Sequence, residues 1–78
     1  MNNKQSFYEA IILGREIEFI HNNIKYFESY DENGWYIDNL HDDSRQYFDS
    51  CDELMIFARL NGVIIEECWD GMEIEYIL

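Results

Sequence analysis

The sequence predicts an α+β domain with a short N-terminal helix, an antiparallel sheet of three to four strands, a second helix and a final C-terminal strand. Two observations predict the sheet. Apolar and polar residues alternate over residues 15–39 and 72–78, and the turn signals Asn22-Asn23 and Asn33-Gly34 divide the first stretch into short strands. A third observation, a capping box that begins at Ser50, places a helix between the two strand regions.

The N-terminal helix is expected after a polar lead-in of about five residues. Ser6 suits the N-cap position, and Glu9 completes a capping box three residues later. Phe7 and Ile11 follow with helical spacing, and Gly14 ends the helix. Because so short a helix is marginal on its own, we expect it to lie on the sheet.

Three strands are expected next, at Ile17–Ile20, Ile24–Tyr30 and Trp35–Asn39. Tight turns at Asn22-Asn23 and Asp31–Gly34 join them, because Asn and Gly tolerate positive φ. We expect this meander to have an apolar inner face and an acidic outer face.

A charged loop at Leu40–Ser44 and a fourth strand at Arg45–Asp49 are expected after the meander. Ser50 and Glu53 then form the capping box of the second helix, and Asn61-Gly62 is expected to end it. The residues expected to form the buried stripe of this helix are Leu54, Phe57, Ala58 and Leu60.

The end of the chain contains one ambiguous segment and one clear strand. Val63–Trp69 begins with β-branched residues, which favour a strand, but its apolar residues also fit one face of a helix. We prefer a short helix there. After a turn at Asp70-Gly71, Met72–Leu78 alternates as a strand. Its two expected faces are Ile74, Tyr76 and Leu78 on one side and Glu73, Glu75 and Ile77 on the other.

Composition indicates one domain spanning residues 1–78, with an unusual charge. Hydrophobic residues make up 47% and aromatic residues 17%, which is enough for a core. Seventeen acids and five bases give a net charge of −12. The net charge of a small domain is usually roughly 2–8 in magnitude. So large a negative charge disfavours direct binding to nucleic acid or to an anionic membrane, and it favours a basic protein partner. Alternatively, the charge serves solubility only.

The cellular setting is inferred from what the sequence lacks. Two cysteines are too few for a disulfide framework, the first residues do not form a secretory signal, and no apolar run approaches membrane-span length. We therefore expect a reduced, cytoplasmic protein.

A resemblance to known proteins rests on positions spread over most of the chain. They are Gly14-Arg15-Glu16-Ile17-Glu18-Phe19, Gly34-Trp35-Tyr36, Asn61-Gly62, Trp69-Asp70 and Glu73-Ile74. In this arrangement the chain resembles small uncharacterised acidic proteins of Gram-positive bacteria and their phages. In size and acidity, though not in motif, it is also similar to phage-encoded inhibitors of host defence, including anti-CRISPR proteins and other DNA mimics. The resemblance carries no activity over to particular residues.

For each group of residues that could carry chemistry, the sequence favours a structural role over a catalytic or metal-binding role. His41 with Asp38, Asp42 and Asp43 offers metal ligands, but the chain has no second histidine at ligand spacing, so we interpret them as solvated loop residues. Asp31–Gly34 lacks the further oxygens of a calcium loop. Cys51 and Cys68 lie far in sequence from both histidines, and we interpret them as cap-region and core residues. We expect no catalytic, cofactor-binding or metal-binding residues.

These observations favour a non-enzymatic acidic binding protein. The hypothesis is a phage or mobile-element inhibitor that occupies the basic nucleic-acid-binding surface of a host defence protein, with carboxylates in place of phosphates. The residues expected to bind the partner are Glu16, Glu18, Glu28, Asp31, Glu32, Tyr36, Asp42, Asp43, Glu73 and Glu75.

Two alternatives remain. The first is a small structural or regulatory interaction module, with a homodimer as one form. It would bind through aromatic residues that alternation turns outward, namely Phe27, Tyr36 and one of Tyr47 or Phe48. An unrecognised hydrolase or metal protein comes third.

Overall fold

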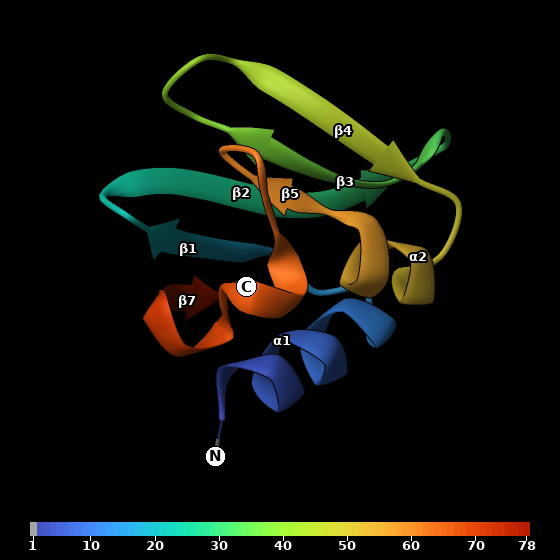
Figure 1. Cartoon of the computed structure of the whole chain (residues 1–78). Coiled ribbons are helices and arrows are strands. Elements are labelled where there is room, and N and C mark those ends of the chain that lie inside the picture. The colour runs from blue at the N-terminus through green and yellow to red at the C-terminus, as the bar shows by residue number, and fades with distance from the viewer. Residues whose placement is uncertain (1) are drawn as a thin grey trace.

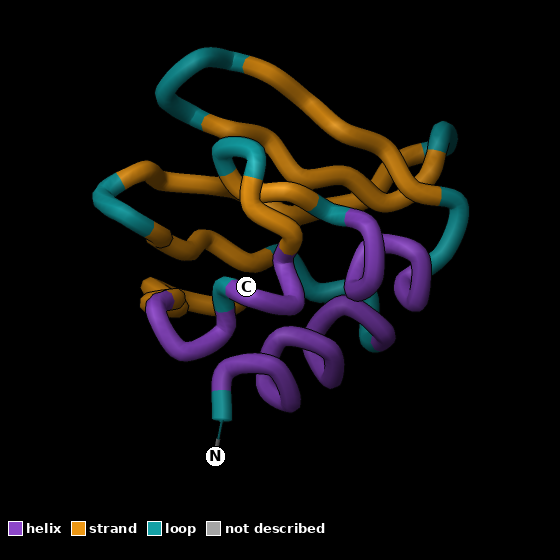
Figure 2. Tube along the Cα trace, in the orientation of Figure 1, coloured by secondary structure: helices purple, strands orange, loops and turns teal. Residues whose placement is uncertain are grey.

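The computed structural model describes residues 2–78 and shows two layers. A five-stranded antiparallel sheet of order β4-β3-β2-β1-β7 forms one layer, and the helices with a small two-stranded sheet pack on one of its faces (Figures 1 and 2). The α+β class is confirmed. In chain order the elements are α1 (Asn3–Ile12), β1 (Ile17–His21), β2 (Ile24–Asp31), β3 (Gly34–Asn39), β4 (Ser44–Phe48), α2 (Cys51–Phe57), β5 (Arg59–Leu60), β6 (Val63–Ile64), the 3₁₀ helices η1 (Ile65–Glu67) and η2 (Trp69–Gly71), and β7 (Met72–Ile77).

Helix α1 begins earlier than the sequence predicts. Its N-cap is Asn2, whose Oδ1 accepts a hydrogen bond from the Gln5 backbone N–H at 2.8 Å. Ser6 therefore lies inside the helix, and its predicted role as N-cap is wrong. Asn is as good an N-cap residue as Ser, and starting at Asn2 adds a helical turn. The added turn brings the Asn3 side-chain amide to the carbonyl oxygens of Trp69 (2.8 Å) and Met72 (2.6 Å), which ties the helix to the start of β7.

The two predicted turns of the meander are confirmed. Asn22 and Asn23 have φ of 50° and 64°, as a type I′ hairpin turn requires. At the second turn Gly34 has φ of +126°, and a Cβ there would lie 2.4 Å from the carbonyl oxygen of Phe48. Glycine is therefore required at this position both by backbone conformation and by the close approach of β4.

Strand β7 pairs with β1 through a bulge that the sequence did not reveal. Ile74 lies opposite Phe19 and Tyr76 lies opposite Glu18, so Glu75 is the extra residue. The bulge reverses the alternation beyond it. Ile77 consequently faces the core, as Ile74 does, and Tyr76 faces solvent. The prediction that Ile74 and Tyr76 share one face and that Ile77 lies on the other is therefore wrong.

The second helix is shorter than predicted. Ser50 caps it as expected, with Oγ accepting a hydrogen bond from the Glu53 backbone N–H at 3.1 Å. It ends at Phe57, whose side chain is 61% exposed, so Phe57 is not part of the buried stripe. The other three predicted stripe residues, Leu54, Ala58 and Leu60, are fully buried.

The Asn61-Gly62 pair is a hairpin turn between β5 and β6, not a helix stop. Both residues have positive φ, 53° and 86°, which is the type I′ geometry that an Asn-Gly pair favours. In Val63–Trp69, both the predicted alternatives, strand and short helix, are present in part. Its first two residues form β6, and the 3₁₀ helix η1 follows at once.

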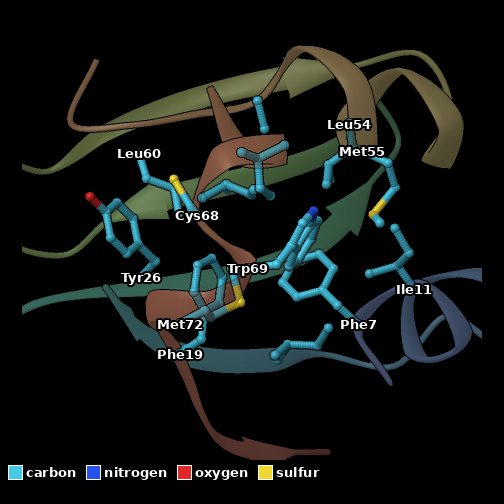
Figure 3. Packing of buried hydrophobic residues seen from close by; sticks show 14 of the residues in the cluster. Phe7, Ile11, Phe19, Tyr26, Leu54, Met55, Leu60, Cys68, Trp69 and Met72 are labelled. Carbon is cyan, nitrogen blue, oxygen red and sulfur yellow. The ribbon is translucent and has the colours of Figure 1, made fainter. Parts of the chain in front are cut away.

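The core lies between the sheet and the helices, and a series of aromatic rings in contact runs through it (Figure 3). Phe7 of α1 packs edge-on against Phe19 of β1 and against Trp69 of η2, with ring centroids 5.2 and 5.3 Å apart. Phe19 in turn stacks on Tyr26 of β2 at 5.3 Å. These contacts join both layers, and such aromatic pairs contribute about 0.5–1.5 kcal/mol each beyond area burial.

One side chain ties the small hairpin to the edge of the main sheet. The Gln46 amide of β4 donates to the Arg59 carbonyl at 2.7 Å and accepts from the Arg59 backbone N–H at 2.9 Å. The side chain thus makes the two hydrogen bonds that a neighbouring strand would make.

Replacing Gln46 by Leu should loosen the β5–β6 hairpin. Both hydrogen bonds would be lost, at a cost of about 1–2 kcal/mol in the free energy of unfolding. Urea unfolding measures that loss, and amide hydrogen exchange at Arg59 should become faster. Gln46→Glu keeps the hydrogen-bond acceptor and loses the donor, so its free energy of unfolding should lie between those of the parent and the Leu variant. Unchanged exchange at Arg59 in the Leu variant would show that core packing alone holds the hairpin.

Candidate functional site: the outer face of the sheet

The outer face of the sheet is the surface turned away from the helices. No element formed by residues 2–78 packs over it (Figures 1 and 2). Strand alternation and the pairing registers place one set of side chains there. They are Glu18, Ile20, Lys25, Phe27, Ser29, Asp31, Tyr36, Asp38, Arg45, Tyr47, Glu73, Glu75 and Tyr76.

Arg45 is at the centre of a network of contacts on the half of the outer face formed by β3 and β4. Its guanidinium lies 3.8 Å from the ring centroid of Tyr36, and its Nε and Nη2 bind the two carboxylate oxygens of Asp38 at 2.5 and 2.9 Å. Its Nη1 donates to the Tyr47 hydroxyl (3.1 Å), which donates to Asp31 (2.8 Å). The hydrogen bonds that Arg45 donates to Asp38 raise the pKa of Arg45 above its ordinary value. The guanidinium is therefore held by both ring stacking and a two-point carboxylate contact.

Lys25 is at the centre of a second network, on the half of the outer face formed by β1 and β7. Its Nζ lies 3.1 Å from a carboxylate oxygen of Glu18 and 3.4 Å from one of Glu75. The Tyr76 hydroxyl donates a hydrogen bond to the second oxygen of Glu18. This hydrogen bond, together with Lys25, lowers the pKa of Glu18, so the carboxylate keeps its charge to a lower pH than an unperturbed glutamate does.

Phe27 lies between these two networks. The pairing registers place Glu18 of β1 directly opposite it on one side and Asp38 of β3 on the other. Directly opposed side chains in antiparallel strands have Cβ atoms about 4.5–5.5 Å apart. The half-buried Phe27 ring is therefore flanked by two carboxylates on an open surface.

Carboxylates outnumber bases on the outer face. Glu18, Glu73, Glu75, Asp31 and Asp38 carry five negative charges, and Lys25 and Arg45 carry two positive charges, which leaves a net charge of −3. Glu16 adds to this at the margin, where its carboxylate accepts a hydrogen bond from Ser29 at 2.7 Å.

The predicted partner-binding residues do not form one patch. Glu16, Glu18, Tyr36, Glu73 and Glu75 lie on or beside the outer face. Asp31, the last residue of β2, also lies on the outer face, and Glu32 follows it in the β2–β3 turn. Asp42 and Asp43 lie at the β3–β4 turn, at the opposite end of the strands (Figure 1).

The remaining exposed acids lie on the other layer. They are Glu9 of α1, Asp49, Asp52 and Glu53 around the start of α2, and Glu66, Glu67 and Asp70 of the 3₁₀ helices. Of these, Glu66 is paired with Lys4 at 2.8 Å. Negative charge therefore surrounds the molecule and is not gathered on the outer face alone.

The prediction that Glu28 binds a partner is wrong, because its side chain is buried. It is 0% exposed, lies opposite the core residues Ile17 and Ile37, and has no hydrogen-bond partner on either carboxylate oxygen among the described residues. It cannot touch a partner. Burial, with a smaller contribution from Glu16, raises its pKa to about 8. The sequence contained the signal, because an outward Phe27 requires an inward Glu28 on the same strand.

Glu28 should make stability fall as pH rises. The unfolded chain releases this proton near pH 4.5, whereas the folded protein keeps it to about pH 8. Between these values the folded state binds more protons, so the free energy of unfolding should decrease by about 1.4 kcal/mol per pH unit. Urea unfolding from pH 5 to 8 measures the slope.

Glu28→Gln provides the control for this slope, because the variant differs from the parent only in lacking this titratable carboxyl group. The variant should lack the pH-dependent destabilisation caused by Glu28, so its free energy of unfolding at pH 8 should exceed that of the parent by an amount on the order of 4 kcal/mol. Parallel pH profiles for the two proteins would mean that the buried carboxyl is already ionised.

Neither thiol has an activated environment. Cys68 is buried, with Sγ 3.4 Å from the carbonyl oxygen of Ile64, and Cys51 is half-buried beside the carbonyl oxygen of Ile11. Burial raises the pKa of both thiols. Within residues 2–78 no three His, Cys, Asp or Glu side chains are grouped to hold a metal ion. Over the same residues, no helix has the length and apolar character needed to span a bilayer.

Sequence reasoning missed the residues that organise the outer face. Lys25, Asp38, Arg45, Tyr47 and Tyr76 were not among the predicted partner-binding residues, yet they form its two networks. Alternation within β4 could have placed Arg45 and Tyr47 on the same face as Tyr36. Their contacts depend on the pairing of β3 with β4, which the sequence does not state.

Comparisons of the chain with protein-family models, with curated proteins and with solved structures found no match.

Proposed function

We propose that this chain is a non-enzymatic acidic protein that occupies a basic protein surface which otherwise binds nucleic acid. In this proposal it acts as a DNA-mimic inhibitor of a host defence protein, similar in role to anti-CRISPR proteins and encoded by a phage or mobile element. The observation that carries the proposal is the open outer face, where carboxylates flank aromatic rings on a protein of net charge −12.

The mechanism would be competition in two steps. Acids on every side of the molecule attract a basic target and speed the encounter, whatever the initial orientation. The outer face then provides the final contact, with carboxylates in place of phosphates and with Tyr47 and Tyr76, 42% and 48% exposed, as anchors.

A homodimer through the exposed aromatic residues is the second candidate, since Tyr47 and Tyr76 lie on the open face. Stacking two copies face to face would bring together two surfaces of net charge −3. Like charges brought together disfavour association. The charge of the outer face therefore favours a basic partner over a second copy.

The chain should displace proteins from DNA. Proteins from a Gram-positive bacterial lysate are bound to immobilised double-stranded DNA and eluted with the purified chain, or with polyglutamate at equal charge concentration. We expect the chain to release a small set of basic proteins that polyglutamate does not release. The release should weaken steeply with added salt, because charge drives it. Release of nothing beyond the polyglutamate set would contradict the proposal.

Two variants of equal charge locate the contact. Glu18→Gln with Glu73→Gln removes two charges from the outer face, and Glu67→Gln with Asp70→Asn removes two from the helical side. The first pair should weaken release roughly tenfold and the second pair much less, because close contacts lose more than distant charges. Equal weakening would show that the outer face is not the contact surface.

A further inference from the structure

We infer that the outer face is a docking surface for an arginine-bearing segment of a protein partner, with one arginine seated over Phe27 between Glu18 and Asp38. This inference rests on the proposed function and specifies the partner side chain that it requires. It predicts a preference for arginine over lysine, which charge alone would not produce.

Arg45 shows how this surface holds a guanidinium. The group stacks on Tyr36 at 3.8 Å and makes a two-point contact with Asp38, while Tyr47 accepts a third hydrogen bond. The site consists of an aromatic face, a carboxylate and a phenol, and the chain's own arginine fills it. These groups match the planar, multiply donating guanidinium and not the compact ammonium of lysine.

Phe27 offers the same kind of site one strand away, and no arginine of residues 2–78 stacks on it. Its ring lies on the open face, and the register places the carboxylates of Glu18 and Asp38 on either side. Their side chains are only 16% and 18% exposed, so both groups are held in place. Arg45 of β4 approaches Asp38 from the side away from Phe27, whereas Lys25 reaches Glu18 from a position two residues before Phe27 on the same strand. A carboxylate has room for further donors.

Charge complementarity identifies the occupant. The outer face has five carboxylates and two bases, so a segment that brings positive charge is favoured and an acidic segment is repelled. A lysine could neutralise the carboxylates, but only a guanidinium also stacks well on the ring and donates in two directions.

The test compares two blocked peptides, Ac-GRGRGRG-amide and Ac-GKGKGKG-amide, titrated into the ¹⁵N-labelled chain and followed by NMR. We expect the arginine peptide to bind at least about fivefold more tightly, from stacking and the two-point contact. Its shift changes should centre on β1, β2 and β3 around Phe27. Equal affinities, no binding of either peptide, or shift changes centred on α1 and α2 would overturn the inference.

Phe27→Leu keeps an apolar side chain and removes the aromatic face. It should bring the arginine-to-lysine affinity ratio towards one while the lysine affinity stays unchanged. Tyr8→Leu, on the helical side, is the matched control and should leave the ratio as in the parent. A ratio that survives Phe27→Leu would overturn the inference. The DNA-displacement result would still stand, because that measurement does not depend on arginine preference.

Discussion

Packing of aromatic rings from both layers is the constraint on which the rest of the structure depends. Phe7 of the helical layer packs against Trp69 of the same layer and against Phe19 of the sheet, and Phe19 stacks on Tyr26 of the next strand. Once these strand residues point inward, alternation sends their neighbours Glu18 and Phe27 to the opposite face. The composition of the open surface is thus a direct consequence of how the core is packed.

Charge has different roles on the two layers. On the helical layer the acids act mostly as single exposed groups, and they contribute to a field that extends in all directions. On the sheet they are built into networks with Lys25, Arg45 and the tyrosines, which fix their positions. A general field sets the rate of encounter, whereas fixed groups can select a partner. The two arrangements therefore differ in range: the acids of the helical layer contribute to a long-range field, and those of the sheet act at short range from fixed positions.

Much of the fold could be predicted from local patterns, and the errors came from interactions between distant segments. Asn22-Asn23 and Ser50 act within a few residues, and both were predicted correctly. The bulge at Glu75 depends on β1, and the place of Arg59 depends on Gln46, so neither could be predicted locally. The candidate site was predicted less well than the fold, because acids counted along the chain carry no information about the face on which they lie.

The bulge in β7 has a consequence for assembly. This strand is an outer edge of the sheet, where unpaired peptide groups would normally invite another chain to add a strand. A bulge breaks the regular spacing of those groups, and Glu73 and Glu75 place negative charge along the same edge. Edge-to-edge pairing of β7 with a strand of another molecule, the step by which fibres grow, is thereby discouraged.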